Sequence, residues 1–543
     1  MTGTAQDNQH PGVQVSDDVH RWWTLTAVCL GTFMLLLDIT IVNVALPNIQ
    51  QDLDSSFSDL QWVVDAYALT LASSLLTSGS LADLFGRRRL YLVGLGIFTL
   101  ASLLCGTATG SLFLELARGL QGIGGAIMFA VSLAMLAETF RGKDRGIAFG
   151  VWGAITGLAV AVGPVVGGAL TSGLSWRWIF FVNLPFGLIA AAITVARVRE
   201  SRDPQPRRPD WLGFVSFTTS MSALVFALIK SSERGFRDGL VLGSFAAAAV
   251  LLLVFVLAEI TGRHPMFDLT LFRKPTFTGG AVAAFGVSAS IFSMLLYLTL
   301  YLQDVLGYSA LQTGLRLLTA SGAIFVVAAV AGRLSSHVPV RILIGPGLIV
   351  VAVGLLLMRG LDAASGWTHL ALGLVVAGVG VGLINPPLAS TAVGVVEPRQ
   401  AGMASGINST FRQVGIATGI ALLGSLFASR VKSTAAERLT ALSGLSHHTQ
   451  QVIGTSLTNG QLAHVLAGLS TAQRGPVVIA ARAAFTTGLN LILLVAAVIA
   501  GVSGILSLLL IRSKDFVHYQ PEETARRARA RTNARYQPPT QGR

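Results

Sequence analysis

Charged side chains are scarce in this chain: they make up only 12% of its 543 residues, whereas hydrophobic residues make up 52%. A soluble protein of this size carries about a quarter charged residues, so the composition excludes a soluble globular protein and predicts a polytopic membrane protein. Cysteine is also scarce. Cys29 and Cys105 both lie in apolar stretches, where a thiol packs as a small hydrophobic group, so we predict neither a disulfide framework nor a metal site.

Three further features are missing. The first twenty residues lack a basic start followed by a short apolar core, so no cleaved signal peptide is expected. No nucleophile and base pair or metal-ligand cluster stands out, so we expect neither an enzyme nor a bound cofactor. The net charge is +13, but the basic residues lie in loops between apolar stretches rather than on one soluble face. Nucleic-acid binding is therefore not expected.

Long apolar stretches are abundant. A helix needs about 20 residues to cross roughly 30 Å of hydrocarbon, and fourteen stretches of suitable length can be placed. The predicted spans are 24–46, 60–81, 90–108, 112–137, 146–171, 178–196, 211–229, 239–259, 277–302, 311–332, 342–358, 368–394, 401–428 and 485–511. An all-α membrane protein with fourteen spans is therefore expected.

The basic residues predict the orientation of these spans. If both termini are cytoplasmic, most of the 39 Lys and Arg residues fall in cytoplasmic segments, as the positive-inside rule requires. A linker from Arg197 to Asp210 contains five arginines and three prolines and separates a six-span bundle from the rest. The predicted parts are a cytoplasmic segment 1–23, a bundle 24–196, a linker with two extra spans 197–276, a second bundle 277–511 with an external loop 429–484, and a basic cytoplasmic tail 512–543.

A few ionisable residues fall inside the apolar stretches. Asp38, Asp65 and Arg118 are expected at a similar depth toward the outer side. Intramembrane charges are costly and mark ion or substrate pathways by default, and an arginine beside a carboxylate can switch that carboxylate's proton occupancy when either partner moves. The alternative is a static ion pair that holds two spans together.

Glycine and charge are concentrated in one loop, between the second and third spans. The residues that form this predicted cytoplasmic gate are Gly79, Asp83, Gly86, Arg87, Arg88 and Arg89. A second concentration lies in the fifth span, at Gly163, Pro164, Gly167 and Gly168. Small residues allow close helix approach and proline removes a backbone hydrogen bond, so a bent, tightly packed helix is expected there.

Several polar and aromatic residues could line a substrate cavity. The candidates are Asn43, Tyr67, Gln121, Phe285, Phe292, Tyr297 and Arg412. The aromatic side chains of the ninth span have spacings that could face a cavity, although such a stripe is also typical of helix packing. Arg412, near the middle of its span, either lines the cavity or pairs internally.

Taken together, these motifs resemble those of the major facilitator superfamily, in particular its fourteen-span drug:proton antiporters. The likeness covers about residues 20 to 515 and rests on Asp38 to Pro47, Gly79 to Arg89, Arg118 to Ala126 and Gly163 to Gly168. It implies two six-helix bundles plus two extra helices. It also implies that Asp38 and Arg118 belong to a proton-coupling network, and that Asp65 matches an acidic position of exporters for cations.

The expected function is proton-coupled export of hydrophobic, cationic drugs or toxic compounds by alternating access. The proton gradient would supply the energy, and no other cofactor is implied. The partners would be a small-molecule substrate, protons and the lipid bilayer, with the protein monomeric in the cytoplasmic membrane. Two alternatives stay open: a dedicated exporter of one metabolite, antibiotic, siderophore or lipid, and a receptor or scaffold without transport.

Overall fold

The computed structural model describes residues 11–55, 57–201, 210–262, 267–335, 337–397, 400–440 and 471–516, and within these ranges every regular element is helical. Thirteen helices are long and apolar enough to cross a membrane, and a bent helix pair brings the number to fourteen. Each coincides with one of the predicted spans, which confirms the predicted fold class.

The first bundle contains six spans. They are α1 (Pro11–Leu53), α2 (Phe57–Phe85), α3 (Arg87–Gly106), α4 (Ser111–Thr139), α5 (Gly142–Gly173) and a sixth span made of α6 (Trp178–Phe181) and α7 (Asn183–Arg197). The interruption in the sixth span precedes the sequence Asn183-Leu184-Pro185, in which the proline lacks a backbone donor. This interruption brings Asn183 to the first position of α7, inside the bundle.

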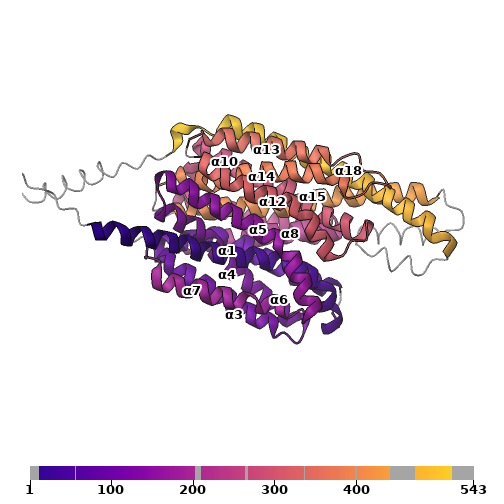
Figure 1. Cartoon of the computed structure of the whole chain (residues 1–543), viewed down its shortest axis with the longest axis horizontal. Coiled ribbons are helices and arrows are strands. Elements are labelled where there is room, and N and C mark those ends of the chain that lie inside the picture. Colours follow the sequence, from indigo (N-terminus) through magenta and orange to yellow (C-terminus); the bar gives the residue numbers. More distant parts are fainter. Residues whose placement is uncertain are drawn as a thin grey trace, which may run out of the picture.

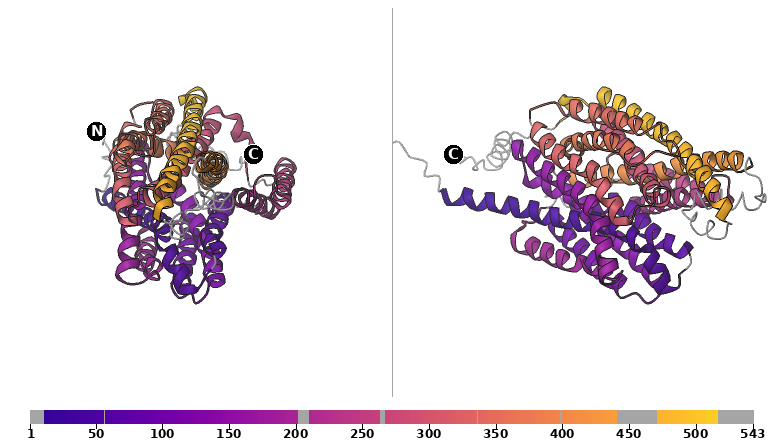
Figure 2. Two further views of the ribbon diagram at one scale, coloured as in Figure 1. Left: turned by 90° about the vertical axis from the view of Figure 1, so that its right-hand side faces the viewer. Right: turned by 45° about the vertical axis from the view of Figure 1, so that its right-hand side comes forward.

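Two extra spans form a hairpin, α8 (Trp211–Arg234) and α9 (Gly239–Thr261). The side chains of Asp210 and Asp238 cap the two helices by accepting hydrogen bonds from backbone N–H groups. Gly235, with φ of 84°, makes the turn between them. α8 packs against α2, whereas α9 packs on α8 and leaves most of its apolar surface uncovered. The hairpin therefore stands at the edge of the molecule (Figure 2, left).

The second bundle holds the remaining six spans. They are the continuous rod of α10 (Pro275–Val287), η2 (Ser288–Phe292), α11 (Ser293–Leu300) and η3 (Tyr301–Val305), followed by α12 (Ala310–Leu334), α13 (Val340–Leu357), α14 (Thr368–Gly394), α15 (Ala401–Thr440) and α18 (Thr471–Leu510). Short 3₁₀ turns, η1 (Leu269–Arg273) and η5 (Ser513–Asp515), flank the bundle. α15 and α18 continue as helices into the stretch 429–484, which we had assigned to a loop. Residues 441–470 lie outside the described ranges.

The two bundles lie side by side, with α5 and α12 between them (Figure 1). α1 begins and α18 finishes at the same end of the molecule, which we call the terminal end; the other is the opposite end. α2 returns to the terminal end at Phe85, and α15 leaves it at Ala401. The residues predicted to form a gate therefore lie at the terminal end of both bundles.

Candidate functional site

A buried ion pair joins α1 to α4. Arg118 Nη1 lies 2.6 Å from Asp38 Oδ2, and the two side chains are 2% and 0% exposed. Both residues sit in long apolar helices because their neighbours are almost all hydrophobic, so folding carries the charges into the bundle interior. A buried pair is tolerated only when further hydrogen bonds satisfy its remaining polar atoms.

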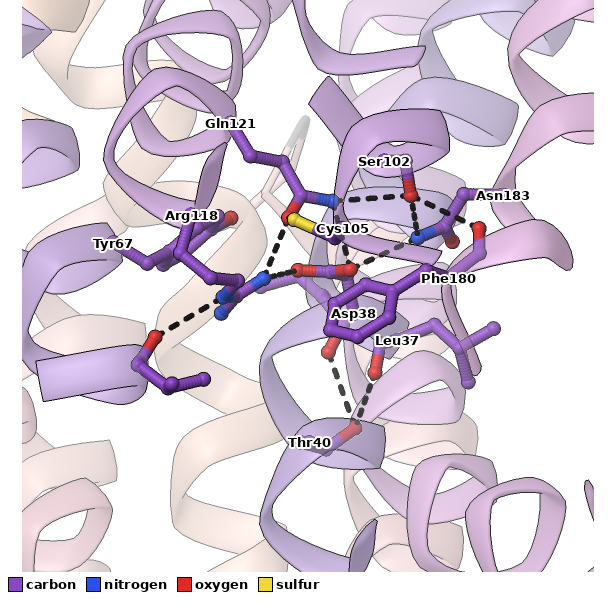
Figure 3. A network of polar contacts seen from close by, with 12 residues as sticks. Leu37, Asp38, Thr40, Tyr67, Ser102, Cys105, Arg118, Gln121, Phe180 and Asn183 are labelled. Atoms are coloured by element: carbon purple, nitrogen blue, oxygen red, sulfur yellow. Dashed lines mark hydrogen bonds and ion pairs between the residues drawn. The ribbon is translucent and has the colours of Figure 1, made fainter. Parts of the chain in front are cut away.

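Asp38 receives those hydrogen bonds from α4 and from α7, and Ser102 of α3 extends the network (Figure 3). The second oxygen of Asp38, Oδ1, accepts from Gln121 Nε2 and from Asn183 Nδ2, each at 2.9 Å. Ser102 Oγ on α3 in turn accepts from Asn183 at 3.0 Å and donates to the carbonyl of Phe180 at 2.9 Å. A single carboxylate thus connects α1, α3, α4 and the broken sixth span.

The guanidinium of Arg118 is fully surrounded. Its Nη1 also donates to Gln121 Oε1 at 2.7 Å, and its Nε donates to the carbonyl of Val63 at 3.2 Å. The Cζ atom lies 4.2 Å from the centroid of the Tyr67 ring, within the range of a cation–π interaction. Tyr67 and Gln121, which we had considered as cavity residues, are therefore parts of this ion-pair network.

Asp65 occupies a different environment. It lies on α2, two residues after Val63, and its side chain is only partly buried. The hydrogen bonds to Asp38 come from α4 and α7 instead. The expected layer of Asp38, Asp65 and Arg118 therefore contains one tight pair and one carboxylate in a more open position. The side chain of Asn43 lies outside the part of the chain that the structure describes.

At the terminal end, Asp83 connects the two bundles. Its carboxylate accepts from Nε and Nη2 of Arg87, at 3.1 and 2.8 Å, within the first bundle. It also accepts from the backbone N–H groups of Gly402 and Met403 at 3.0 and 2.9 Å. These N–H groups belong to the first turn of α15, where the helix dipole favours a negative charge. Asp83 therefore holds the start of α15 against α2.

Three other residues of the predicted gate, Gly86, Arg88 and Arg89, act within the first bundle. Gly86 has φ of 108°, which allows the sharp turn from α2 into α3. The backbone N–H groups of Arg88 and Arg89 donate to the carboxylate of Glu200 at 3.0 and 3.1 Å. The Arg88 side chain donates to the carbonyl of Val195 at 2.7 Å, whereas Arg89 is largely exposed. Glu200 was not among the predicted site residues.

Glycines bring the bundles into backbone contact at the terminal end. Gly79 lies so close to Gly402 that a Cβ atom on either residue would collide with the carbonyl oxygen of the other. The same relation holds between Gly146 of α5 and Gly332 of α12. Ser405 of α15 adds a hydrogen bond, at 2.5 Å, to the carbonyl of Ala130. The bundles are therefore tightly joined on this side.

The glycine motif of α5 serves a different contact. A Cβ on Gly163 would collide with Thr40, and one on Gly167 would lie 2.9 Å from Ile41, so this half of α5 packs against α1 of its own bundle. Nothing lies within 4 Å of a Cβ on Gly168. The two halves of α5 meet at 42°, in agreement with the expected bend. The ring of Pro164 lies outside the part of the chain that the structure describes.

The predicted cavity aromatics of the ninth span are mainly packing residues. Tyr297 is 6% exposed, its hydroxyl donates to the carbonyl of Ile420 at 3.1 Å, and its ring lies 5.4 Å from that of Phe427. Phe285 and Phe292 are partly buried, and Phe292 packs against the core of the same bundle. Among the described residues, Arg412 has one hydrogen-bond partner, Asn385, whose Oδ1 lies 3.2 Å from Nη1.

Reasoning from the sequence missed the residues that complete the network. Ser102 and Asn183 bind the Asp38 cluster, and Glu138 lies 3.4 Å from Arg87. A signal was available for Asn183, because an amide inside an apolar span needs a buried partner. Which span would supply that partner depends on the packing of the bundle.

Comparisons with known proteins agree with this architecture. The model of the Major Facilitator Superfamily matches residues 28–420. Among solved structures, the crystal structure of the human organic anion transporter MFSD10 (TETRAN) is similar, with a TM-score of 0.58 and 15% sequence identity over 88% of this chain and 99% of that one. At this identity the likeness concerns the fold.

Curated relatives are closer in sequence. The multidrug resistance protein Stp of Mycobacterium tuberculosis (strain CDC 1551 / Oshkosh) is 39% identical over 76% of both chains. The tetracenomycin C resistance and export protein of Streptomyces glaucescens is 35% identical, again over 76% of both. The drug efflux pump JefA of M. tuberculosis is 31% identical over 88% of this chain and 95% of its own. By family model, sequence and fold, this chain belongs to the major facilitator superfamily.

Proposed function

We propose that this protein is a proton-coupled antiporter that exports hydrophobic drug-like compounds. Its relatives by sequence are multidrug and antibiotic resistance transporters, and transport of small molecules across a membrane is the common property of the family. The observation that carries the coupling is the buried Asp38–Arg118 pair, because a carboxylate held by a single cation inside a membrane protein is suited to exchange its charge for a proton.

The network gives protonation a structural consequence. Protonation of Asp38 removes the negative charge that compensates Arg118, and a buried arginine without a counter-charge is strongly destabilised. Gln121 and Asn183 donate their hydrogen bonds to the ionised carboxylate of Asp38. Protonation of this carboxylate therefore changes these hydrogen bonds as well. Since these partners lie on different helices, a proton at Asp38 changes how α1, α4 and α7 pack.

The contacts at the terminal end supply the second element of the mechanism. In the proposed orientation both termini are cytoplasmic. The contacts of Asp83, Arg87 and the glycines then close the cytoplasmic side of the transporter. The described conformation then corresponds to the state in which cargo leaves outward. An external proton on Asp38 would weaken the packing of the first bundle, release the cytoplasmic contacts and allow the return to the inward-facing state.

The test is transport by the purified full-length protein in liposomes with an imposed pH gradient. A panel of hydrophobic compounds of both charges, including the cation ethidium, serves as cargo. Gradient-driven accumulation is expected for wild type and is expected to fall at least roughly tenfold in Asp38→Asn, because one partner of the buried pair can no longer change charge. Asp65→Asn measures the contribution of the more open carboxylate.

Asp238→Asn is the matched control, because asparagine caps a helix as well as aspartate does and Asp238 lies at the start of α9, away from the network. Full gradient-driven transport by Asp38→Asn would show that the pair is a static contact and would overturn the coupling assignment. Accumulation of one panel member alone would indicate a dedicated exporter rather than a multidrug one.

A further inference from the structure

Arg412 on α15 carries a charge that the described part of the protein does not compensate. Its Nη1 donates to Asn385 Oδ1 of α14 at 3.2 Å, but Nε and Nη2 are buried and have no hydrogen-bond partner among the described residues. Arg412 also takes part in none of the ion pairs of those residues. Arg118, which also lies within a membrane span, has both a carboxylate and an amide as partners.

Two neighbours of Arg412 are also unsatisfied. Asn408 is 4% exposed, and neither its amide nitrogen nor its oxygen has a hydrogen-bond partner among the described residues. Ser409 is fully buried, and its hydroxyl likewise has none there. Asn408 and Ser409 precede Arg412 by four and three residues, so the three side chains occupy one face of the helix. Together they present four unused donors: Nε and Nη2 of the guanidinium, the Asn408 amide and the Ser409 hydroxyl.

The cluster lies beside the interface between the bundles. Ser405, one turn before Ser409, makes the hydrogen bond to Ala130 of α4 that joins the bundles. Arg412 is about 16 Å along α15 from its first residue, near the middle of the membrane. Next to Asn408 is a small cavity that Thr276 of α10 and Thr391 of α14 help to line. This cavity lies within the second bundle, whereas the hydrogen bond of Ser405 places the same part of α15 against the first bundle, so the donors lie next to the contact between the bundles.

Buried donors without acceptors are rare, and a buried unpaired cation is rarer still. Since donors outnumber acceptors and one of them is charged, the missing group has to be an anion or a strong acceptor, and a planar carboxylate matches the fork of a guanidinium. We propose that Arg412, Asn408 and Ser409 form an anion-recognising subsite that binds an acidic group of the exported compound. This inference rests on the proposed export function and changes the expected charge of the cargo, which we had taken to be cationic.

The subsite can be tested by equilibrium binding to the purified full-length protein, without any gradient. The probes are pyrenebutyrate, a hydrophobic fluorescent carboxylate, and its neutral amide. Wild type is expected to bind the acid more tightly than the amide. Arg412→Gln is expected to weaken binding of the acid by roughly ten- to a hundredfold, which is the range for one charge-assisted hydrogen bond, and to leave binding of the amide unchanged.

Two further variants show whether the effect comes from the charge of Arg412. Arg412→Lys retains the charge and is expected to recover part of the preference for the acid. Arg316→Gln is the matched control, because Arg316 is also an intramembrane arginine. Its Cζ atom lies 3.6 Å from the centroid of the Tyr308 ring, and its Nη1 donates to the carbonyl of Gln312. Its removal should not change the preference for the acid.

Equal binding of acid and amide by wild type, or an unchanged preference in Arg412→Gln, would overturn the subsite. The proposed export function is judged separately, by gradient dependence in the transport assay. If transport were driven by the gradient but acid and amide bound equally well, the proposed subsite would be wrong and the antiporter function would stand. A preference for the acid without gradient-driven transport would reject the coupling and keep the binding site.

Discussion

At the scale of single residues, Arg118 and Arg412 are intramembrane arginines with opposite degrees of compensation. Arg118 is bound by Asp38, Gln121 and the carbonyl of Val63, and it stacks on Tyr67. Such a site is stable only with its counter-charge in place, so it can respond to a proton. Arg412 lacks a counter-charge among the described residues, so it is suited to respond to a ligand. The two arginines can therefore divide coupling and recognition between the two bundles.

Asn183 supplies a test of the network that leaves both charges in place. We expect Asn183→Ala to lower the free energy of unfolding by about 1–3 kcal/mol, because Asp38 Oδ1 and Ser102 Oγ each lose a buried donor. Gradient-driven transport should fall with it. Thermal unfolding in detergent measures the first effect.

Ser244→Ala is a suitable control for this measurement, because Ser244 is only partly buried and donates its hydrogen bond to Leu240 of its own helix; a change within about 0.5 kcal/mol is expected. If Asn183→Ala were as stable and as active as the control, Asn183 would not support the ionised carboxylate.

The sequence alone could identify the charged members of the site but not its geometry. Asp38 and Arg118 stand out because a charge in an apolar span is costly. That Gln121 joins both of them, while Tyr297 packs on α15, depends on which helices become neighbours. Periodicity assigns a residue to a face of its helix and does not say what that face meets. For the same reason Glu200 and Glu138 could not be assigned to the gate.

At the scale of elements, glycine decides where the bundles can touch. Gly146, Gly150, Gly153 and Gly157 recur at helical spacing on α5, and each meets an atom of α12 or α14. Without side chains at these positions the helix axes approach closely, which favours van der Waals packing in a lipid environment. The second half of α5 packs instead on α1 through Gly163 and Gly167. One helix thus joins the bundles at the terminal end and returns to its own bundle beyond it.

Gly79→Val tests whether this close approach is needed. A Cβ at Gly79 would collide with the backbone of Gly402, and backbone cannot yield as a flexible side chain does. We expect the variant to separate α2 from α15 at the terminal end and to reduce transport at least roughly tenfold. A cysteine at Met403 should then react faster with a polar maleimide.

The control for this substitution is Gly96→Val, in which the new side chain meets no atom within 4 Å. Transport and maleimide reactivity close to those of wild type are expected for it. Equal behaviour of the two valine variants would mean that the contact between Gly79 and Gly402 does not limit the cycle.

The spans themselves were predictable because hydrocarbon thickness sets a minimum length of apolar sequence. Hydrocarbon thickness does not limit how far a helix continues outside the membrane. For this reason α15 reaches Thr440 and α18 starts at Thr471, beyond the spans predicted for them. The interruption of the ninth span by η2 and η3 also left no clear signal. Backbone hydrogen bonding can change locally from the α-helical to the π-helical pattern without any change in hydropathy.

At the scale of the whole molecule, the two bundles are joined at one end. The terminal-end contacts of Asp83, Ser405 and the glycines bridge the bundles, whereas further along α5 the glycine contacts return to α1. The α8–α9 hairpin packs on one side of this arrangement, where α8 contacts α2 of the first bundle and α15 of the second (Figure 2). In the proposed mechanism the bundles rotate against each other as rigid bodies, as related halves of transporters do.

A rotation of this kind predicts opposite changes at the two ends. Spin labels on cysteines at Arg141 and Leu334 report on the terminal end, and labels at Leu174 and Leu311 report on the opposite end; all four residues are exposed. The native Cys29 and Cys105 are buried and should not react. Because Asp38→Asn imitates the protonated carboxylate, we expect it to lengthen the first distance and shorten the second.

The size of the change follows from the geometry. A rigid rotation on the order of 15° acting over roughly 30 Å of bundle displaces the helix ends by roughly 8 Å, which double electron–electron resonance resolves easily. Asp238→Asn, remote from the ion pair, should leave both distances as in wild type. If Asp38→Asn moved neither pair, or moved both in the same direction, the charge at Asp38 would not control which end is closed, even if transport still required a proton gradient.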